Sequence, residues 1–136
     1  MVEFPNKYSW VRFWKFDIEK IEKVIKNLNF ELPTIIDVVR FNDGCGGSHE
    51  VFNKKHLIQV DETVSRKRAS NILWHELCHG NQYYKYLDFD SYMNAYNQAG
   101  GNMFSKGYDD NYFEIEARKW EEKYSSHLLT KNIWSR

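Results

Sequence analysis

The sequence has little cysteine and no excess of either charge. Its two cysteines, Cys45 and Cys78, lie far apart and outside any CxxC pair, which excludes a disulfide framework and a zinc knuckle. Nineteen basic and nineteen acidic side chains cancel, so no long-range field draws the chain to nucleic acid or to an anionic membrane. We therefore expect neither nucleic acid nor a membrane among its partners.

Long apolar runs are also missing. No stretch approaches the length of a membrane span, and the N-terminal region lacks the apolar segment of a secretory signal. A cytoplasmic protein is therefore expected, in keeping with the low cysteine content. At 136 residues the chain has the length of one domain, so we predict a single domain over residues 1–136. The sequence does not indicate an oligomeric state.

Aromatic residues are plentiful, with nine Phe, nine Tyr and five Trp to supply buried area. The apolar periodicity predicts an α+β fold: a small antiparallel or mixed sheet packed on an active-site helix and on a second, ligand-bearing helix. Residues 91–99 allow a short helix, and residues 100–111 are expected to be a loop. The expected helices cover residues 17–29, 65–86 and 111–129, and the expected strands cover residues 35–41, 49–52 and 57–60.

One motif carries chemistry, the pentad HELCH at residues 75–79. His75 and His79 are four residues apart on a predicted helix, so their imidazoles project from one face and can share a zinc ion. Glu76 lies about 100° round the helix from His75, where its carboxylate can reach a water at an open position of the metal. Zinc lowers the pKa of such a water, which makes Glu76 the predicted general base. The alternative is that His75 and His79 are two surface histidines that bind no metal and that Glu76 is a surface glutamate without a catalytic role.

A catalytic zinc ion needs a third protein ligand. His49, His56 and His127 are weak candidates, whereas the helix expected after residue 111 begins with acids in the segment NYFEIEAR. Helical periodicity does not choose between Glu114 and Glu116, because the two flank the apolar stripe of that helix by similar angles. The acidic pair Asp109 and Asp110 and the histidines remain as further alternatives.

The HExxH pentad followed by Glu114-Ile115-Glu116-Ala117 resembles the gluzincins, and among them the small ImmA/IrrE-type peptidases of bacteria and phages. The resemblance implies a minimal zincin-like fold, one Zn²⁺ per chain and Glu114 as the third ligand. Glu116 would then orient a ligand histidine or be an alternative ligand. The family's second motif commonly continues with Asn or Asp, where this chain has Arg118. The resemblance also implies that an extended peptide substrate lies along an edge strand of the sheet. We expect residues 57–60 to be this edge strand.

A hydrogen-bond donor that stabilises the transition state is expected near the metal. Four residues qualify by type and position: Tyr83, Tyr108, Tyr112 and His127. With nine tyrosines in the chain, each of these also has an ordinary reading as a packing or surface residue. The sequence therefore leaves the identity of this donor open.

The function predicted from these residues is a zinc-dependent endopeptidase that hydrolyses peptide bonds of a protein or peptide substrate. A first alternative is a non-catalytic metal-binding or protein-interaction module with a similar fold. A second is a DNA-associated peptidase of the SprT-like type, which normally has a histidine as third ligand. The neutral charge balance counts against the second alternative.

Overall fold

The structure is a computed structural model that describes residues 16–29, 34–36, 47–52, 55–60, 64–125 and 133–134. The first helix, α1, spans Ile18–Asn27 and is capped by Asp17, whose side chain accepts a hydrogen bond from the backbone N–H of Lys20. Its apolar stripe faces the core, because Ile21 and Val24 are buried while the charged positions between them lie outside. The helix predicted over residues 17–29 is therefore present.

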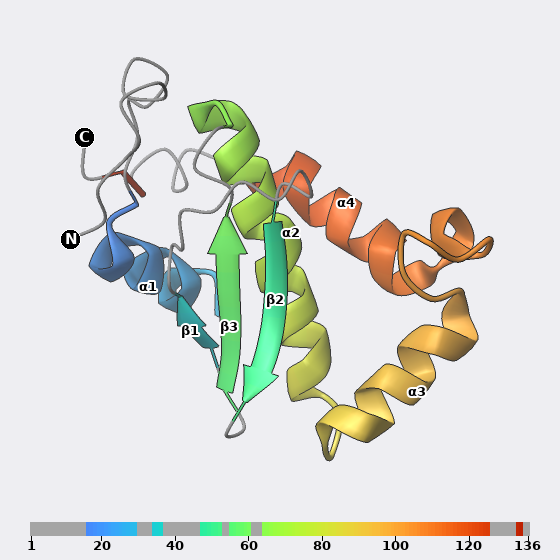
Figure 1. Ribbon diagram of the computed structural model, residues 1–136. Coiled ribbons are helices and arrows are strands. Elements are labelled where there is room, and N and C mark those ends of the chain that lie inside the picture. The colour runs from blue at the N-terminus through green and yellow to red at the C-terminus, as the bar shows by residue number, and fades with distance from the viewer. Residues whose placement is uncertain are drawn as a thin grey trace, which may run out of the picture.

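Three short strands form a mixed sheet in the order β1-β3-β2 (Figure 1). β1 (Thr34–Ile36) pairs in parallel with β3 (Lys55–Val60), and β2 (Gly47–Phe52) pairs with β3 in antiparallel fashion. The prediction that residues 57–60 form an edge strand is wrong, because β3 is the central strand. Most of residues 35–41, expected to be one strand, lie outside the described residues.

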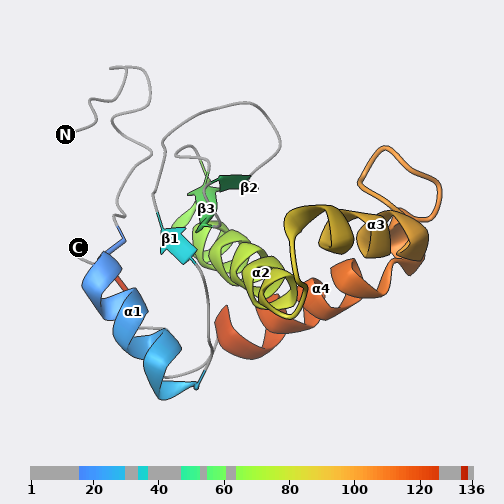
Figure 2. The same cartoon turned by 90° about the horizontal axis from the view of Figure 1, so that it is seen from below.

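The second helix, α2, runs from Arg66 to Tyr84 and is the central element of the molecule. Ser65 caps its N-terminus by accepting from the backbone N–H of Arg68. The helix packs on β2 and β3, and α4 (Tyr112–Ser125) runs along it on another side (Figures 1 and 2). Because α2 is covered from several directions, Leu73, Trp74 and Leu77 are fully buried.

Helix α3 (Phe89–Ala99) occupies part of the segment that the sequence left uncertain. Asp88 caps it by accepting from the backbone N–H of Ser91, so the helix begins two residues before the expected start. The loop predicted after it contains one 3-10 turn, Tyr108–Asp110. Gly100 has φ 147°, and a Cβ there would meet the carbonyl oxygen of Gly107 at 2.1 Å, so only glycine allows this turn to close.

The α+β fold class expected from the sequence is not what the structure shows. Helix makes up 71% of the residues whose side chains are described, in four α-helices and one 3-10 turn, whereas the described strands have three, six and six residues. The difference lies in the proportions, because α3, which the sequence only allowed as a short helix, adds eleven helical residues to α1, α2 and α4. The described part of the chain is therefore mostly helical, with a small sheet on one side of α2.

Two clusters of buried side chains hold these elements together. The larger joins α1, β3, α2 and α4, and includes the fully buried Trp74 beside Tyr124. The smaller is aromatic and joins α2, α3 and α4 through Tyr83, Tyr92, Tyr96 and Phe113. The aromatic cluster matters for the site, because it holds α3 against the two helices that carry the pentad and Glu114.

Candidate metal centre

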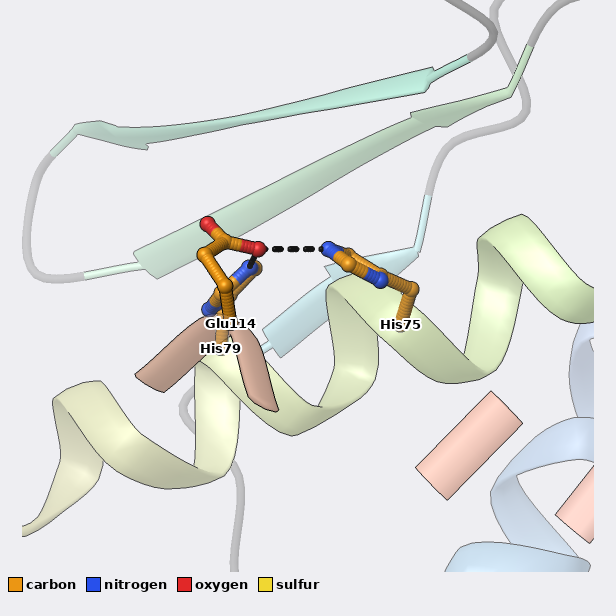
Figure 3. A group of neighbouring side chains, drawn as sticks. All are labelled: His75, His79 and Glu114. Carbon is orange, nitrogen blue, oxygen red and sulfur yellow. Dashed lines mark hydrogen bonds and ion pairs between the residues drawn. The ribbon is translucent and has the colours of Figure 1, made fainter. Parts of the chain in front are cut away.

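Helix α2 presents the two pentad histidines on one side, and the start of α4 presents a carboxylate opposite them (Figure 3). Oε1 of Glu114 lies 2.9 Å from Nε2 of His75 and 3.2 Å from Nε2 of His79. The three ligand atoms lie within 4.8 Å of one another. These three side chains are the group that can hold a metal ion among the residues the structure describes.

Spacing on the helix explains why both histidines face Glu114. A separation of four residues places them one turn apart on the same face, with ring centroids 4.9 Å apart. Two ligands of a tetrahedral zinc ion, each about 2.1 Å from it, lie roughly 3.4 Å from each other. The separations of 2.9 and 3.2 Å from Glu114 are slightly shorter than this, so Glu114 would move outward to admit an ion, and two imidazoles with one carboxylate are donors that zinc takes.

Each histidine has its other ring nitrogen held by a partner. Nδ1 of His75 lies 2.8 Å from Oε2 of Glu121, which is two turns beyond Glu114 on α4. Nδ1 of His79 lies 2.8 Å from Oε1 of Gln82. Since both partners offer an oxygen, each Nδ1 donates its N–H and each Nε2 points at Glu114.

The second oxygen of Glu114 is also engaged, because the hydroxyl of Tyr96 on α3 donates to Oε2. Burial raises the pKa of Tyr96, and the hydrogen bond to Glu114 and the charge of Glu114 raise it further, so the hydroxyl remains a donor. With Oε2 occupied in this way, Oε1 is the oxygen left for a metal ion. Glu114 is thus arranged to bind through one oxygen.

The ligands of the site influence each other's ionisation. Burial alone would lower the pKa of His75, but hydrogen bonds to Glu114 and Glu121 and the charge of Glu76 outweigh it and raise the pKa to about 9. Burial alone would raise the pKa of Glu114, but hydrogen bonds from His75 and His79 hold it below the usual range. In the metal-free protein at neutral pH, a protonated His75 therefore faces an ionised Glu114.

Glu76 is 8% exposed and follows His75 on α2. Its negative charge contributes to the raised pKa values of His75, Tyr92 and Tyr108, and Glu76 is not one of the three described residues that could hold a metal ion together. A proton acceptor beside a metal must not itself be a ligand, because a ligand carboxylate could not also move a proton freely. The role of Glu76 as general base stays a prediction.

Glu116 does not join the metal ligands. Its Oε1 accepts from Nε2 of Gln82 at 3.0 Å and from the thiol of Cys78 at 3.6 Å. Arg118, at the position where the resembling family has Asn or Asp, donates instead to the backbone carbonyl of Asp109. The residue that contacts Nδ1 of His75 is Glu121 and not the residue at position 118.

The residues expected to stabilise a transition state lie in different surroundings. Tyr108 is half-buried beneath the guanidinium of Arg118, and burial and the charge of Glu114 raise its pKa. Tyr112 is 58% exposed with its ring stacked on Phe113, and Tyr83 is buried in the aromatic cluster. The charges of Glu114 and Glu76 thus both contribute to the raised pKa of Tyr108.

Of the other candidate ligands, the two whose side chains the structure describes lie outside the group that could hold a metal ion. Asp109 and Asp110 are exposed in the 3-10 turn. His49 and His56 fall on β2 and β3, where no side chain at those positions is described, and His127 and Cys45 lie outside the described residues.

Three residues of the site were missed by the sequence analysis: Gln82, Tyr96 and Glu121. Glu121 could have been found, because positions seven apart on a helix share a face and Glu121 follows Glu114 by seven. Gln82 is one turn from His79 on the same helix, which is also a local signal. Tyr96 had no such signal, because α3 meets Glu114 only through the tertiary fold.

No family model, no curated protein and no solved structure matches this chain. Among the residues that the structure describes, no helix combines the length and the apolar character needed to cross a bilayer.

Proposed function

We propose that the protein is a zinc-dependent endopeptidase. The observation that carries the proposal is the approach of Glu114 Oε1 to Nε2 of both His75 and His79, at 2.9 and 3.2 Å. Two imidazoles and one carboxylate are the ligands of many catalytic zinc ions, which keep a fourth position open. The resemblance of HExxH and ExEA to the gluzincins supports the same assignment.

Zinc bound by these residues would supply a Lewis acid that polarises the substrate carbonyl and acidifies a water molecule. Glu76 takes a proton from the attacking water and passes it to the leaving amine. Glu121 and Gln82 hold the two imidazoles, and Tyr96 holds the carboxylate of Glu114. Tyr108 is the residue we assign to stabilise the developing negative charge on the substrate.

The proposed substrate is a protein or peptide in extended conformation. β3 has partners on both sides, so the peptide would add to β2, which packs on α2 and pairs with β3 alone among the described strands. A carboxylate at the third ligand position disfavours the SprT-like alternative, in which that ligand is normally a histidine. The proposed site needs no nucleic acid.

Glu76→Gln tests the catalytic part of the proposal. The variant should bind one zinc ion per chain, as the wild type does, and should lose hydrolysis of a peptide library by about 10²- to 10⁴-fold, because it cannot accept the proton. Zinc is measured by elemental analysis and cleavage by mass spectrometry. Unchanged turnover excludes Glu76 as the base, and a zinc-loaded wild type that cleaves nothing supports a non-catalytic metal-binding protein.

Glu114→Ala tests the ligand assignment. The variant should hold zinc far more weakly than the wild type, because two histidines remain from three ligands. Glu122→Gln is the matched control, since Glu122 is an exposed acid of the same helix. Equal zinc affinity in all three proteins, measured by competition with a chelator, would show that Glu114 is not a ligand.

A further inference from the structure

Gln82 stands between α4 and the ligand histidine His79. It is 3% exposed and makes hydrogen bonds with both of its amide atoms. Oε1 lies 2.8 Å from Nδ1 of His79, while Nε2 donates to the backbone carbonyl of Phe113 at 2.9 Å and to Glu116 at 3.0 Å. One buried amide therefore connects a histidine on α2 with two acceptors on α4.

The surroundings allow only one orientation of this amide. With the oxygen and nitrogen exchanged, Oε1 would face the carbonyl of Phe113 and the carboxylate of Glu116, neither of which can donate. The hydroxyl of Tyr92 also donates to Oε1, at 3.3 Å. The oxygen of Gln82 therefore faces His79, and His79 must present a protonated Nδ1 to it.

We propose that Glu116 and Gln82 form a positioning relay that keeps Nδ1 of His79 protonated and Nε2 available to the metal. The inference rests on the proposed metal centre, to which it adds a role for an acid that does not touch the metal. Glu116 holds the amide of Gln82, and Gln82 holds the ring of His79. Helix α4 thus holds the Nδ1 side of both histidines. Glu121 contacts His75 directly, and Glu116 contacts His79 through Gln82.

The relay predicts an order of zinc affinities. Glu116→Ala should weaken zinc binding by about 10-fold, at the lower end of what outer partners of ligand histidines contribute. Glu116→Gln keeps an acceptor oxygen and should lose less. Gln82→Glu should lose more than either, because a carboxylate there still accepts from His79 but cannot donate to Phe113 and faces Glu116.

A swap of the two groups provides the decisive test. In Gln82→Glu/Glu116→Gln, the amide introduced at position 116 donates to the carboxylate introduced at position 82, which still accepts from His79. The swap should therefore recover zinc affinity by about 10-fold over Gln82→Glu. The matched control, Gln82→Glu/Glu122→Gln, removes the same charge from an exposed position of α4 and should recover none.

Zinc affinity is measured by chelator competition on chains shown to be folded by circular dichroism. Long-range ¹H–¹⁵N spectra of the zinc-loaded wild type should show His79 with Nδ1 protonated and Nε2 bound to metal. Three results would each overturn the relay. The double variant could bind zinc no more tightly than Gln82→Glu, or Glu116→Ala could bind zinc as tightly as the wild type. The third result is a metal ion bound to Nδ1 of His79. A wild type that binds no zinc would instead overturn the proposed function, so the two failures are distinguishable.

Discussion

The surroundings of His75 and of His79 differ in charge and in exposure to solvent. The side chain of His75 is 17% exposed and its Nδ1 faces the carboxylate of Glu121, with a guanidinium nitrogen of Arg68 3.8 Å from that residue. The side chain of His79 is 2% exposed and its Nδ1 faces the neutral amide of Gln82. One turn of helix separates an ionic, partly exposed ligand from a buried ligand with a neutral partner.

In the proposed metal site, this difference would combine a rigidly held imidazole with an imidazole that responds to pH. Around His79, the buried hydrogen bonds of Gln82 fix the ring, since removing this amide leaves a buried polar atom unsatisfied. Around His75, two carboxylates favour the protonated imidazole, which must lose its proton before it binds metal. The comparison can be tested at four places.

The largest effect is expected from loss of either ligand ring. His75→Ala and His79→Ala should each lose stoichiometric zinc after gel filtration, because each removes one of three protein ligands. Elemental analysis provides the measurement, and Lys67→Ala, an exposed change on the same helix, is the control. Full metal content in both histidine variants would mean that the ion is bound elsewhere.

A second effect concerns pH and belongs to the His75 side. Since the pKa of His75 in the metal-free protein is about 9, zinc affinity should rise by up to about tenfold per pH unit from pH 6.5 to 9. The free energy of unfolding of the metal-free protein should instead fall as the pH rises. A pKa raised above its unfolded value of about 6.5 stabilises the fold fully below pH 6.5, and this contribution, about 3 kcal/mol, is lost as pH rises towards 9.

Urea unfolding with chelator present, at pH 6.5 and pH 9, measures the stability change. Glu121→Gln should reduce both pH dependences, because it removes one of the hydrogen-bonded carboxylates that raise the pKa of His75. If zinc affinity and metal-free stability depend on pH identically in the wild type and in Glu121→Gln, the proposed difference between His75 and His79 is wrong.

A smaller effect is expected at the tyrosines of α3. Tyr96→Phe removes the hydroxyl that donates to Glu114 and should lower zinc affinity by roughly tenfold, the value of one hydrogen bond to a charged group. Tyr92→Phe removes a hydroxyl 3.3 Å from Oε1 of Gln82 and should have less effect, because that atom keeps its closer partner His79. Chelator competition on both proteins gives the comparison, which the reverse order would contradict.

The smallest effect is expected at Cys78. Burial raises the pKa of its thiol, and the charge of Glu116 and a hydrogen bond to it raise the pKa further, so the folded protein should react slowly with thiol reagents at pH 8. Cys78→Ala should change zinc affinity less than Glu116→Ala does, because the 3.6 Å contact to Glu116 is weak. Labelling followed by peptide mass spectrometry tests the first statement. Rapid labelling of Cys78 in the folded chain would contradict its burial.

Local signals predicted the helices well and the fold class poorly. The apolar periodicity and the cap residues Asp17 and Ser65 place α1 and α2 close to their observed bounds. Asp88 is also a cap residue, but the glycines that follow α3 obscured the length of that helix. The balance between helix and sheet depends on which segments pair and pack, and pairing between distant strands leaves no periodic trace in one segment.

The sequence by itself determined the relation between His75, Glu76 and His79, because a separation of one helical turn fixes their directions wherever the helix lies. It also placed two acids, Glu114 and Glu116, on opposite sides of the helix expected after residue 111. Only the tertiary structure decided between them, since the rotation of α4 against α2 sets which carboxylate meets the histidines. The same packing turns Glu116 towards Gln82 and brings Tyr96 to Glu114, contacts between separate elements that no local spacing encodes.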